Sequence, residues 1–449
     1  MKAIGCMAFY LILGFPGLPM WAHAESALDV AESSRARCQL TDPDEFREIF
    51  GPPIEERAKT DGDWSLIEFR YENGQAIFGK PKQEVQTPFV LRGLVINENS
   101  DDIGCDSKMV LRTEKDLRKL TQFWGFTNVS LMQVDLRNHS ELVRKMPFDS
   151  ETEWPDQLPD GFEPDSIMEA GKNPGLGIRE LHKEGIKGQG VGIAIIDQPL
   201  LLGHAEYRDR IVYYDAVQVP GHPAQMHGSP VASIAVGKNI GVAPESKLYY
   251  FATPTWKRDN RYYAEALERI LEFNTRLPKD EQIRVVSVSN GAFKSIANYP
   301  LWEAAFRKAT TQGIYVSTCV RDTLDYLLLD LGFDRDPDDP ASYAPAEWLK
   351  RARPNPERVW IPGANRTIAS FRGIDVYQSE RGGGLSWGAP YLAGLAALAF
   401  QVRPDLEPDD IEKLIKDTAP SMPFGKVVNP GRVISEARTM KKQALLSAD

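Results

Sequence analysis

The sequence is short of positive charge and of long apolar segments. Its 53 lysine and arginine residues are outnumbered by 63 aspartate and glutamate residues, which gives a formal net charge of −10. A nucleic-acid partner held by bulk electrostatic attraction is therefore not expected. Beyond the N-terminal segment no apolar run is long enough to span a bilayer. The sequence also has no internal repeat and no low-complexity tract, and its composition is that of an ordinary globular protein.

The N-terminal segment has the pattern of an export signal. Lys2 supplies the positive charge, residues 3–18 are mostly apolar, and residues 22–24 read Ala-His-Ala, a small-x-small cleavage pattern. An uncleaved membrane anchor is the alternative, but the apolar run is short and is interrupted by glycine and proline. We therefore expect residues 1–24 to be a signal peptide and the mature protein to be secreted or periplasmic, with no stable membrane span.

Cysteine is scarce, and removal of the signal would leave Cys38, Cys105 and Cys319. In an oxidising compartment an odd number leaves one thiol unpaired. Cys38 and Cys105 both lie in the N-terminal region, so they are the expected pair. Cys319 lies in an apolar stretch and is expected to be a buried thiol.

A chain of 449 residues has room for about two or three domains. Residues 25–165 predict a small α+β domain with no catalytic constellation. Its expected elements are a helix over 42–51, a hairpin over 64–71 and 75–79 with an Asn-Gly turn, a strand over 88–97, and a helix that begins at Thr113. Residues 147–164 are rich in Pro, Asp and Gly and predict a linker.

From residue 166 to residue 441 the pattern becomes an alternation of strands and helices, followed by a tail over 442–449. The alternation predicts an α/β fold, with a parallel sheet covered by helices on both faces. The expected strands cover 191–196, 247–251, 284–288 and 314–320, and the expected helices cover 174–184, 226–236, 261–277, 301–313, 391–402 and 409–418. Ligands on this architecture bind at the carboxyl ends of the strands.

Three residues with complementary chemistry are expected at element ends. Asp197 follows the apolar strand 191–196, His227 opens a helix, and Ser386 follows a run of glycines and opens another helix. A serine needs a base to remove its proton, histidine does this near neutral pH, and a carboxylate fixes the imidazole tautomer. The helix that begins beside Ser386 offers free N–H groups to an oxyanion. The alternative for each residue taken alone is an ordinary cap or turn.

These segments resemble the blocks of the subtilisin-like serine proteases, or subtilases. The strongest likeness is Gly384-x-Ser386-x-x-Ala389-Pro390 followed by Ala393-Gly394, and the blocks around His227 and Asp197 follow the family order. The resemblance covers residues 174–420 and implies a subtilisin-like, doubly wound parallel sheet. It also implies that a peptide substrate is received by a segment that corresponds to Ser289, Asn290 and Gly291.

The sequence departs from the family pattern in several places. Gln198-Pro199 follows the aspartate, Pro230 stands where a second histidine is usual, and Trp387 replaces the usual Met. Asp322 falls on the position of the asparagine that donates to the oxyanion in the family. An ionised carboxylate only accepts hydrogen bonds, and loss of one such donor costs about 3–4 kcal/mol in subtilisin. We therefore expect an active but slower enzyme that is favoured by mildly acidic pH.

No metal site is expected from the sequence. Asp334, Asp336, Asp338 and Asp339 lack the glycine and the closing acidic residue of a calcium loop, so they predict a solvated acidic loop. Calcium elsewhere stays possible by resemblance, since subtilases often bind it. His204 and His222 are expected to be surface or loop residues.

The favoured function is a secreted serine endopeptidase that acts on polypeptides through Asp197, His227 and Ser386. The main alternative is a pseudoprotease, in which the same fold serves as a binding or regulatory module. An esterase or amidase that acts on small molecules differs in its substrate only. The role of residues 25–165, as propeptide or accessory domain, and the oligomeric state are open.

Overall fold

The computed structural model describes the chain in two compact units, Met1–Phe162 and Glu163–Asp449. The described residues are 55–61, 64–71, 74–81, 90–96, 103–104, 109–112, 117, 128–289, 294–319, 324–350, 352, 355–356 and 358–440. The expected signal peptide, the helix over 42–51, the helix that begins at Thr113, both N-terminal cysteines and the tail lie outside these residues or largely so. The expected domain boundary, between residues 165 and 166, lies three residues after the division between the units.

The first unit contains an antiparallel sheet of order β1-β2-β3-β4-β5. Its strands are β1 (Glu55–Asp61), β2 (Trp64–Tyr71), β3 (Gly74–Pro81), β4 (Val90–Ile96) and β5 (Ile103–Gly104). Strands β2 and β3 pair from Tyr71↔Gly74 to Trp64↔Pro81, which is the hairpin expected around the Asn-Gly sequence. The expected strand over 88–97 corresponds to β4.

The remainder of this unit contains short elements. They are β6 (Met109–Val110), β7 (Val129–Ser130), α5 (Ser140–Val143) and β8 (Phe148–Asp149). The segment over 147–164, expected to be a linker, is packed over most of its length. Phe148, Trp154 and Phe162 lie edge to face with ring centroids 5.2 to 6.4 Å apart. Proline and glycine mark an irregular path, but the aromatic side chains between them form a small core of their own.

The second unit is built on a five-stranded sheet of order β10-β11-β9-β12-β13, in which every pairing is parallel. The strands are β9 (Gly192–Asp197), β10 (Ile211–Ala216), β11 (Lys247–Ala252), β12 (Ile283–Val288) and β13 (Tyr315–Thr318). Every residue of the central strand β9 is buried. A strand buried on both faces requires a continuous apolar run, which is what this part of the sequence supplies.

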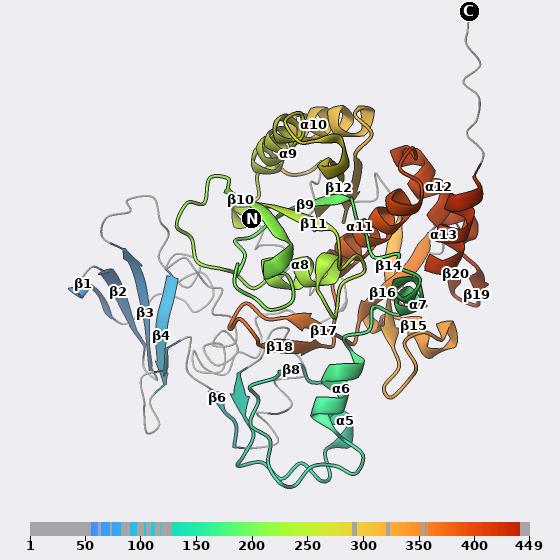
Figure 1. The fold of residues 1–449 in the computed structure, drawn as a ribbon. Coiled ribbons are helices and arrows are strands. Elements are labelled where there is room, and N and C mark those ends of the chain that lie inside the picture. Colours follow the sequence, from blue (N-terminus) through green and yellow to red (C-terminus); the bar gives the residue numbers. More distant parts are fainter. Residues whose placement is uncertain are drawn as a thin grey trace, which may run out of the picture. The chain divides into compact units, whose positions relative to one another are not determined.

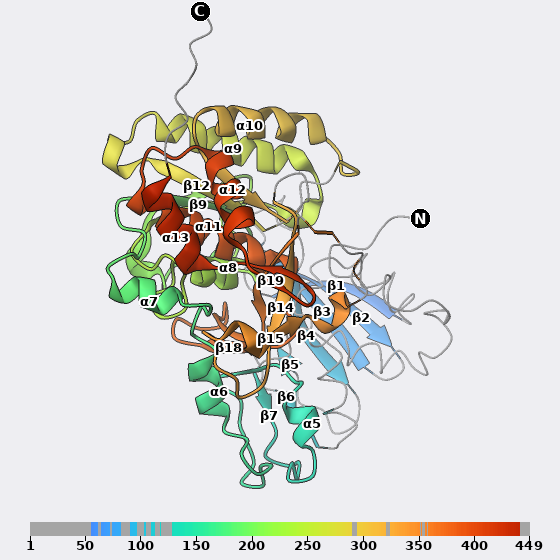
Figure 2. The same ribbon diagram turned by 90° about the vertical axis from the view of Figure 1, so that its right-hand side faces the viewer.

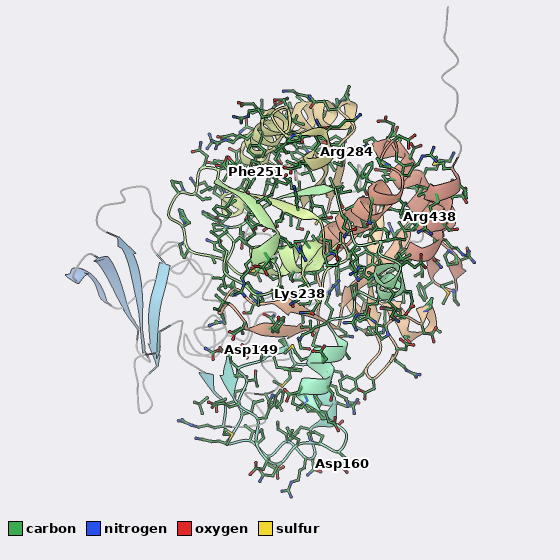
Figure 3. All side chains as sticks on the ribbon, viewed as in Figure 1. Asp149, Asp160, Lys238, Phe251, Arg284 and Arg438 are labelled. Atoms are coloured by element: carbon green, nitrogen blue, oxygen red, sulfur yellow. The ribbon has the colours of Figure 1, made fainter. Side chains whose placement is uncertain are left out.

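Helices cover both faces of this sheet (Figure 1). On one face lie α9 (Asn260–Asn274) and α10 (Tyr299–Thr311), and on the other lie α8 (Gly228–Val236) and α11 (Leu385–Val402). The two faces form separate apolar clusters, one around Phe251 and one around Tyr250, because neighbouring residues of β11 point to opposite sides. Phe251 lies among the dense side chains of this unit (Figure 3). The α/β fold with helices on both faces is therefore confirmed.

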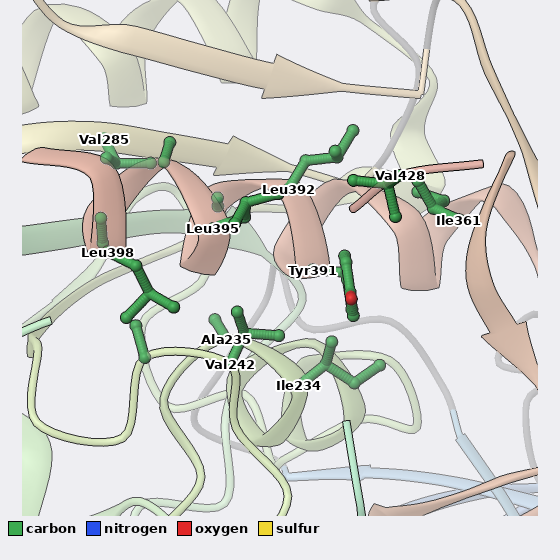
Figure 4. Packing of buried hydrophobic residues seen from close by; sticks show 14 of the residues in the cluster. Ile234, Ala235, Val242, Val285, Ile361, Tyr391, Leu392, Leu395, Leu398 and Val428 are labelled. Atoms are coloured by element: carbon green, nitrogen blue, oxygen red, sulfur yellow. The ribbon is translucent and has the colours of Figure 1, made fainter. Parts of the chain in front are cut away.

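Helix α11 is the core helix of the second unit. Its side chains Leu392, Leu395 and Leu398 pack with residues of α8, β12 and β16 (Figure 4). By length and composition it is the single candidate membrane span among the described residues, yet 78% of it is buried inside the protein. The expectation that no later segment reaches this length was wrong, because the helix expected over 391–402 begins at Leu385 and continues through Pro390.

A second sheet, of order β15-β14-β16-β20-β19, completes the unit. Its strands are β14 (Tyr326–Leu331), β15 (Tyr343–Pro345), β16 (Val359–Ala364), β19 (Ser421–Met422) and β20 (Gly425–Val427). A hairpin of β17 (Arg366–Ala369) and β18 (Tyr377–Glu380) leads into α11. Helices α12 (Pro408–Thr418) and α13 (Pro430–Thr439) lie beside α11 (Figure 2), and α6 (Pro164–Ala170) and α7 (Ile178–Lys183) begin the unit.

Helix α7 begins four residues later than expected. Residues 175–177 have φ angles of 84°, 52° and 81°, which are incompatible with a right-handed helix. Asp338 holds this turn, because its side chain accepts hydrogen bonds from Asn173 Nδ2 at 3.0 Å and from Gly177 N at 2.8 Å. The acidic loop was expected to be solvated, and Asp334, Asp336 and Asp339 are exposed. Asp338 is half-buried and accepts hydrogen bonds from Asn173 and Gly177 instead.

Candidate active site

Asp197 is the last residue of β9, at the carboxyl end of the parallel sheet. Its side chain is fully buried, and Oδ1 lies 2.7 Å from the backbone nitrogen of Gln198 and 2.7 Å from Nδ1 of His227. Its other oxygen, Oδ2, has no hydrogen-bond partner among the described residues. A buried carboxylate is costly unless it is paired, so the histidine is its main compensation.

His227 is the N-cap residue of α8 and its side chain is 14% exposed. Because an ionised carboxylate can only accept a hydrogen bond, the ring donates to Asp197 through Nδ1–H. In this tautomer Nε2 carries the free lone pair, which is the state that a general base requires.

Gln198, which follows Asp197 in the chain, also holds the backbone at His227. The side-chain oxygen of Gln198 accepts from the backbone nitrogen of His227 at 3.3 Å, and its Nε2 donates to Thr255 Oγ1 at 3.2 Å. Its backbone oxygen accepts from Tyr250 OH at 2.5 Å. Burial raises the pKa of Tyr250 well above its ordinary value, so this hydroxyl stays a donor. The departure from the family pattern at Gln198 therefore supplies two contacts that keep the histidine segment in place.

A glycine is required directly after His227. A Cβ atom on Gly228 would lie 2.6 Å from Tyr250 OH and 2.8 Å from the backbone oxygen of Gln198. Backbone cannot give way cheaply at such distances, so the start of α8 approaches β9 and β11 only without a side chain here. The Gly that follows His227 in the sequence thus has a packing reason that is independent of any catalytic role.

Ser386 lies in the first turn of α11, after the N-cap residue Gly384. Its Oγ donates to the backbone oxygen of Ser289 at 2.9 Å. Among the described residues no hydrogen bond joins this hydroxyl to His227. Catalytic hydrogen bonds are often formed only when substrate is bound, and rotation about a single side-chain bond redirects a serine hydroxyl.

The oxygen of Ser289 has a second donor, the thiol of Cys319 at 2.9 Å. Tyr326 OH donates to the backbone oxygen of Leu385 at 2.8 Å and contacts the same thiol at 3.7 Å. Cys319 was expected to be buried, and it is a half-buried thiol that shares its acceptor with Ser386. Ser289, which follows β12, is therefore the meeting point of these side chains.

Trp387 connects the serine segment to the histidine. Its ring stacks on the ring of His227 with centroids 5.3 Å apart and planes at 29°. The indole is buried, and no residue in the described parts of the chain accepts a hydrogen bond from its N–H. The structure therefore brings Asp197 and His227 into direct contact, and it places the residue that follows Ser386 on the same imidazole.

Several expected site residues lie outside the described ranges. They are Asn290, Gly291 and Asp322, so the expected oxyanion role of Asp322 and the substrate roles of Asn290 and Gly291 stay predictions. In the described parts of the chain no group of three or more His, Cys, Asp or Glu residues is placed to hold a metal ion. This finding leaves open the calcium that the resemblance allows.

His204 is not a surface residue. It is fully buried, with Nε2 2.9 Å from the backbone oxygen of Val376, while Nδ1 accepts from the backbone nitrogen of Glu206 at 3.2 Å. Burial lowers the pKa of this ring. Of the two expected alternatives, a surface or a loop residue, the loop is confirmed and the surface position is wrong, because both ring nitrogens have backbone partners. His222 is half-buried against Trp256, with ring centroids 5.3 Å apart.

The sequence analysis missed two contacts with His227, which are made by the neighbours of the candidate residues Asp197 and Ser386. Gln198 and Trp387 were noted as departures from a family pattern, without a contact to His227. A polar residue directly after the aspartate and a ring directly after the serine were the available signals, because neighbours of site residues share their position in space.

Part of the chain is similar in sequence to known proteins. Residues 188–323 match the model of the subtilase family. The subtilisin-like protease PopC of Myxococcus xanthus (strain DK1622) is 27% identical over 332 residues, which cover 64% of this chain and 64% of that protein. The M-protease of Shouchella clausii (strain KSM-K16) is 25% identical over 279 residues, which cover 58% of this chain and 66% of that protein.

Solved structures similar to this chain include the prenylagaramide maturation protease PagA, with a TM-score of 0.44 and 16% identity over 58% of this chain and 98% of that chain. Another is a structure of the subtilase cytotoxin SubAB assembly, with a TM-score of 0.45 and 13% identity over 59% of this chain and 95% of that chain. The family match lies on the segment that carries both Asp197 and His227. Over residues 188–323 the chain therefore resembles the subtilase family.

Proposed function

We propose that this protein is a serine endopeptidase that cleaves polypeptides through Asp197, His227 and Ser386. The observation that carries the proposal is the 2.7 Å contact between the buried carboxylate of Asp197 and Nδ1 of His227. It leaves Nε2 as a free base, and it lies against the helix start that bears Ser386 through the stacked Trp387 ring.

Each residue has a role that follows from its chemistry. Asp197 fixes the tautomer and stabilises the imidazolium cation once it forms. His227 removes the proton from Ser386 and later returns it to the leaving amine. Ser386 attacks the peptide carbonyl and forms an acyl-enzyme, which water then hydrolyses.

The start of α11 supports the negative charge that develops on the carbonyl oxygen. The first backbone N–H groups of a helix have no partner within the helix, and the helix dipole is positive at this end. Ser386 lies in this first turn. We assign its N–H as one oxyanion donor and propose Asp322, when protonated, as a second one, since a neutral carboxyl group can donate.

Before attack, the hydroxyl of Ser386 must leave the backbone oxygen of Ser289 and turn toward His227. The resemblance places Ser289 at the start of the segment that receives the peptide backbone. A substrate N–H that binds this oxygen would compete with the serine hydroxyl for the acceptor and release it, so the resting contact fits an enzyme that awaits substrate.

A catalytically impaired pseudoprotease is the second candidate function. The observation that favours it is the same hydrogen bond, since Ser386 donates to Ser289 and not to His227. The expected change at the oxyanion position, Asp322, favours it as well.

A fluorophosphonate probe separates the two candidates, because it labels only an activated serine. We expect labelling of the full chain and its complete loss in Ser386→Ala and His227→Ala, while Ser370→Ala, a buried serine outside the site, keeps it. An unlabelled wild-type protein with an unchanged fold would favour the pseudoprotease. Cleavage of denatured casein against that of a small ester then distinguishes a peptidase from an esterase.

We also propose that the protein is exported and acts outside the cytoplasm. The support is the N-terminal sequence pattern and the frequent secretion of subtilases. N-terminal sequencing of the protein recovered from culture medium or periplasm tests this. A start at Glu25 indicates signal removal alone, and a start near residue 166 indicates that residues 25–165 are a propeptide.

A further inference from the structure

A buried carboxylate lies shortly before the nucleophile in the chain. Glu380 is the last residue of β18, and it is only 4% exposed. Five residues separate it from Ser386, and the glycines 382–384 are among them. Burial of an ionisable group costs stability unless hydrogen bonds or charges compensate it, so the contacts of this side chain indicate what it holds.

Glu380 binds the backbone of the glycine turn. Its Oε1 accepts from the backbone nitrogen of Gly382 at 3.1 Å, and the backbone N–H of Gly383 also donates to the carboxylate. Its Oε2 accepts from Gln378 Nε2 at 2.9 Å. Burial raises the pKa of Glu380, while these donors and the charge of Arg381 act in the opposite direction.

The described residues supply two further hydrogen bonds to the turn, and in one of them Trp387 N donates to the backbone oxygen of Gly384 at 2.8 Å. Trp348 Nε1 donates to the backbone oxygen of Gly382 at 3.2 Å. Gly383 has a φ of 54°, and a Cβ there would lie 2.7 Å from the backbone oxygen of Gly363. A segment of three glycines has a large conformational entropy when it is not held, so the carboxylate that binds its N–H groups restricts it most directly.

We infer that Glu380 is a positioning residue for Ser386: by binding the N–H groups of the turn 382–384, it fixes the place at which α11 begins and therefore the place of the serine. This inference rests on the proposed nucleophilic role of Ser386. No proton or bond changes at Glu380 during the reaction.

The two variants Glu380→Ala and Glu380→Gln test the inference. Alanine removes both acceptors, whereas glutamine keeps an oxygen for the glycine N–H groups without the charge. We measure the rate constant of fluorophosphonate labelling on the folded full-length protein, and kcat and KM for a small ester, with the melting temperature measured in parallel.

Glu206→Gln is the matched control. Glu206 is 1% exposed, and it accepts from Asn239 and Ile240 and from Tyr377 OH at the start of β18. It therefore reports any general loosening of β18 that does not act on the glycine turn.

We expect Glu380→Ala to lower the labelling rate by about tenfold or more and Glu380→Gln by roughly threefold to tenfold, as fits the loss of hydrogen bonds to a charged group. The loss should appear in kcat and not in KM, and Glu206→Gln should keep the wild-type rate even if its melting temperature falls. If Glu380→Ala fails to fold, Glu380→Gln decides alone.

A wild-type labelling rate in Glu380→Gln, or an equal loss in Glu206→Gln, would overturn the positioning role while the proposed function stands. An unlabelled wild-type protein would instead refute the nucleophilic role of Ser386, and the inference would fall with it.

Discussion

The two sides of the candidate site differ in whether hydrogen bonds between side chains join their own proposed site residues directly. The histidine side, defined by Asp197, Gln198 and His227, is joined by direct hydrogen bonds. The serine side, defined by Ser289, Cys319 and Ser386, is arranged around one backbone oxygen that two side chains share. The proposed base, His227, is therefore set before substrate arrives, whereas the proposed nucleophile, Ser386, still has to turn.

This difference has a physical origin. Asp197 and His227 lie on β9 and at the start of α8, which pack tightly because Gly228 has no side chain. A buried carboxylate tolerates one arrangement of its donors. A neutral hydroxyl needs no charged partner, and rotation about one side-chain bond redirects it from one acceptor to another.

The largest effect is expected when the negative charge of Asp197 is removed. Asp197→Asn offers an amide in place of the acceptor and favours the wrong imidazole tautomer, so we expect kcat to fall on the order of 10⁴-fold, the effect of the same change in another serine protease triad. Ester hydrolysis measures it, with circular dichroism as the control for folding. A loss below about tenfold would show that the preset base is not needed.

The next test disturbs the packing that holds the histidine. Gly228→Ala places a methyl group against Tyr250 and Gln198, and we expect a loss of about 1–3 kcal/mol in the free energy of unfolding. The labelling rate of Ser386 should also fall.

Gly431→Ala, in α13, is the matched control, because a Cβ there would meet only Asn429 Oδ1 at 3.6 Å. It should be neutral or slightly stabilising. Equal stability of the two variants in chemical denaturation would contradict the close approach at Gly228.

A smaller effect is expected at the link between the two sides. Trp387→Ala removes the ring that stacks on His227, and aromatic pairs contribute about 0.5–1.5 kcal/mol beyond area burial. We expect the labelling rate to fall roughly twofold to tenfold in Trp387→Ala and less in Trp387→Phe, which keeps a ring. If Trp387→Ala and Trp387→Phe were labelled at the same rate, stacking on His227 would have no effect on the reactivity of Ser386.

The smallest effect on activity is expected at Asp330, outside both sides. Burial raises its pKa from 3.8 to about 6. The folded protein therefore holds this proton more tightly than the unfolded chain does, and the resulting stability is present at low pH and is lost as pH rises from about 4 to about 6.

Asp330→Asn removes this pH-dependent term. The wild-type protein should lose stability relative to the variant by up to about 3 kcal/mol over that interval, at an unchanged labelling rate at pH 7. Thermal melts at pH 4, 5, 6 and 7 measure the difference, and parallel pH profiles of the two proteins would contradict the raised pKa.

The sequence was sufficient for four of the five strands of the central sheet, whereas the edge strand β10 was missed. Apolar β-branched runs predicted β9 and β12, because a strand buried on both faces leaves a continuous signal. The second sheet was missed. Strand β16 contains Pro362 and Gly363, which normally argue against a strand, and tertiary contacts override that preference.

The candidate site shows the same limit. Residue types and order indicated Asp197, His227 and Ser386, but the direction of a hydroxyl depends on which acceptor lies nearest in the folded chain. The contact between Ser386 and the backbone oxygen of Ser289 joins residues 97 positions apart. No local pattern encodes it, and the same holds for the stacking of Trp387 on His227.

Helix α11 carries Ser386, the proposed nucleophile, at one end and fills the interior with the rest of its length. Any change that shifts this helix within the core also shifts the serine, so the proposed activity would be a sensitive measure of interior order. Heating or cavity-forming substitutions deep in the helix should abolish labelling of Ser386 before spectroscopy records loss of the fold.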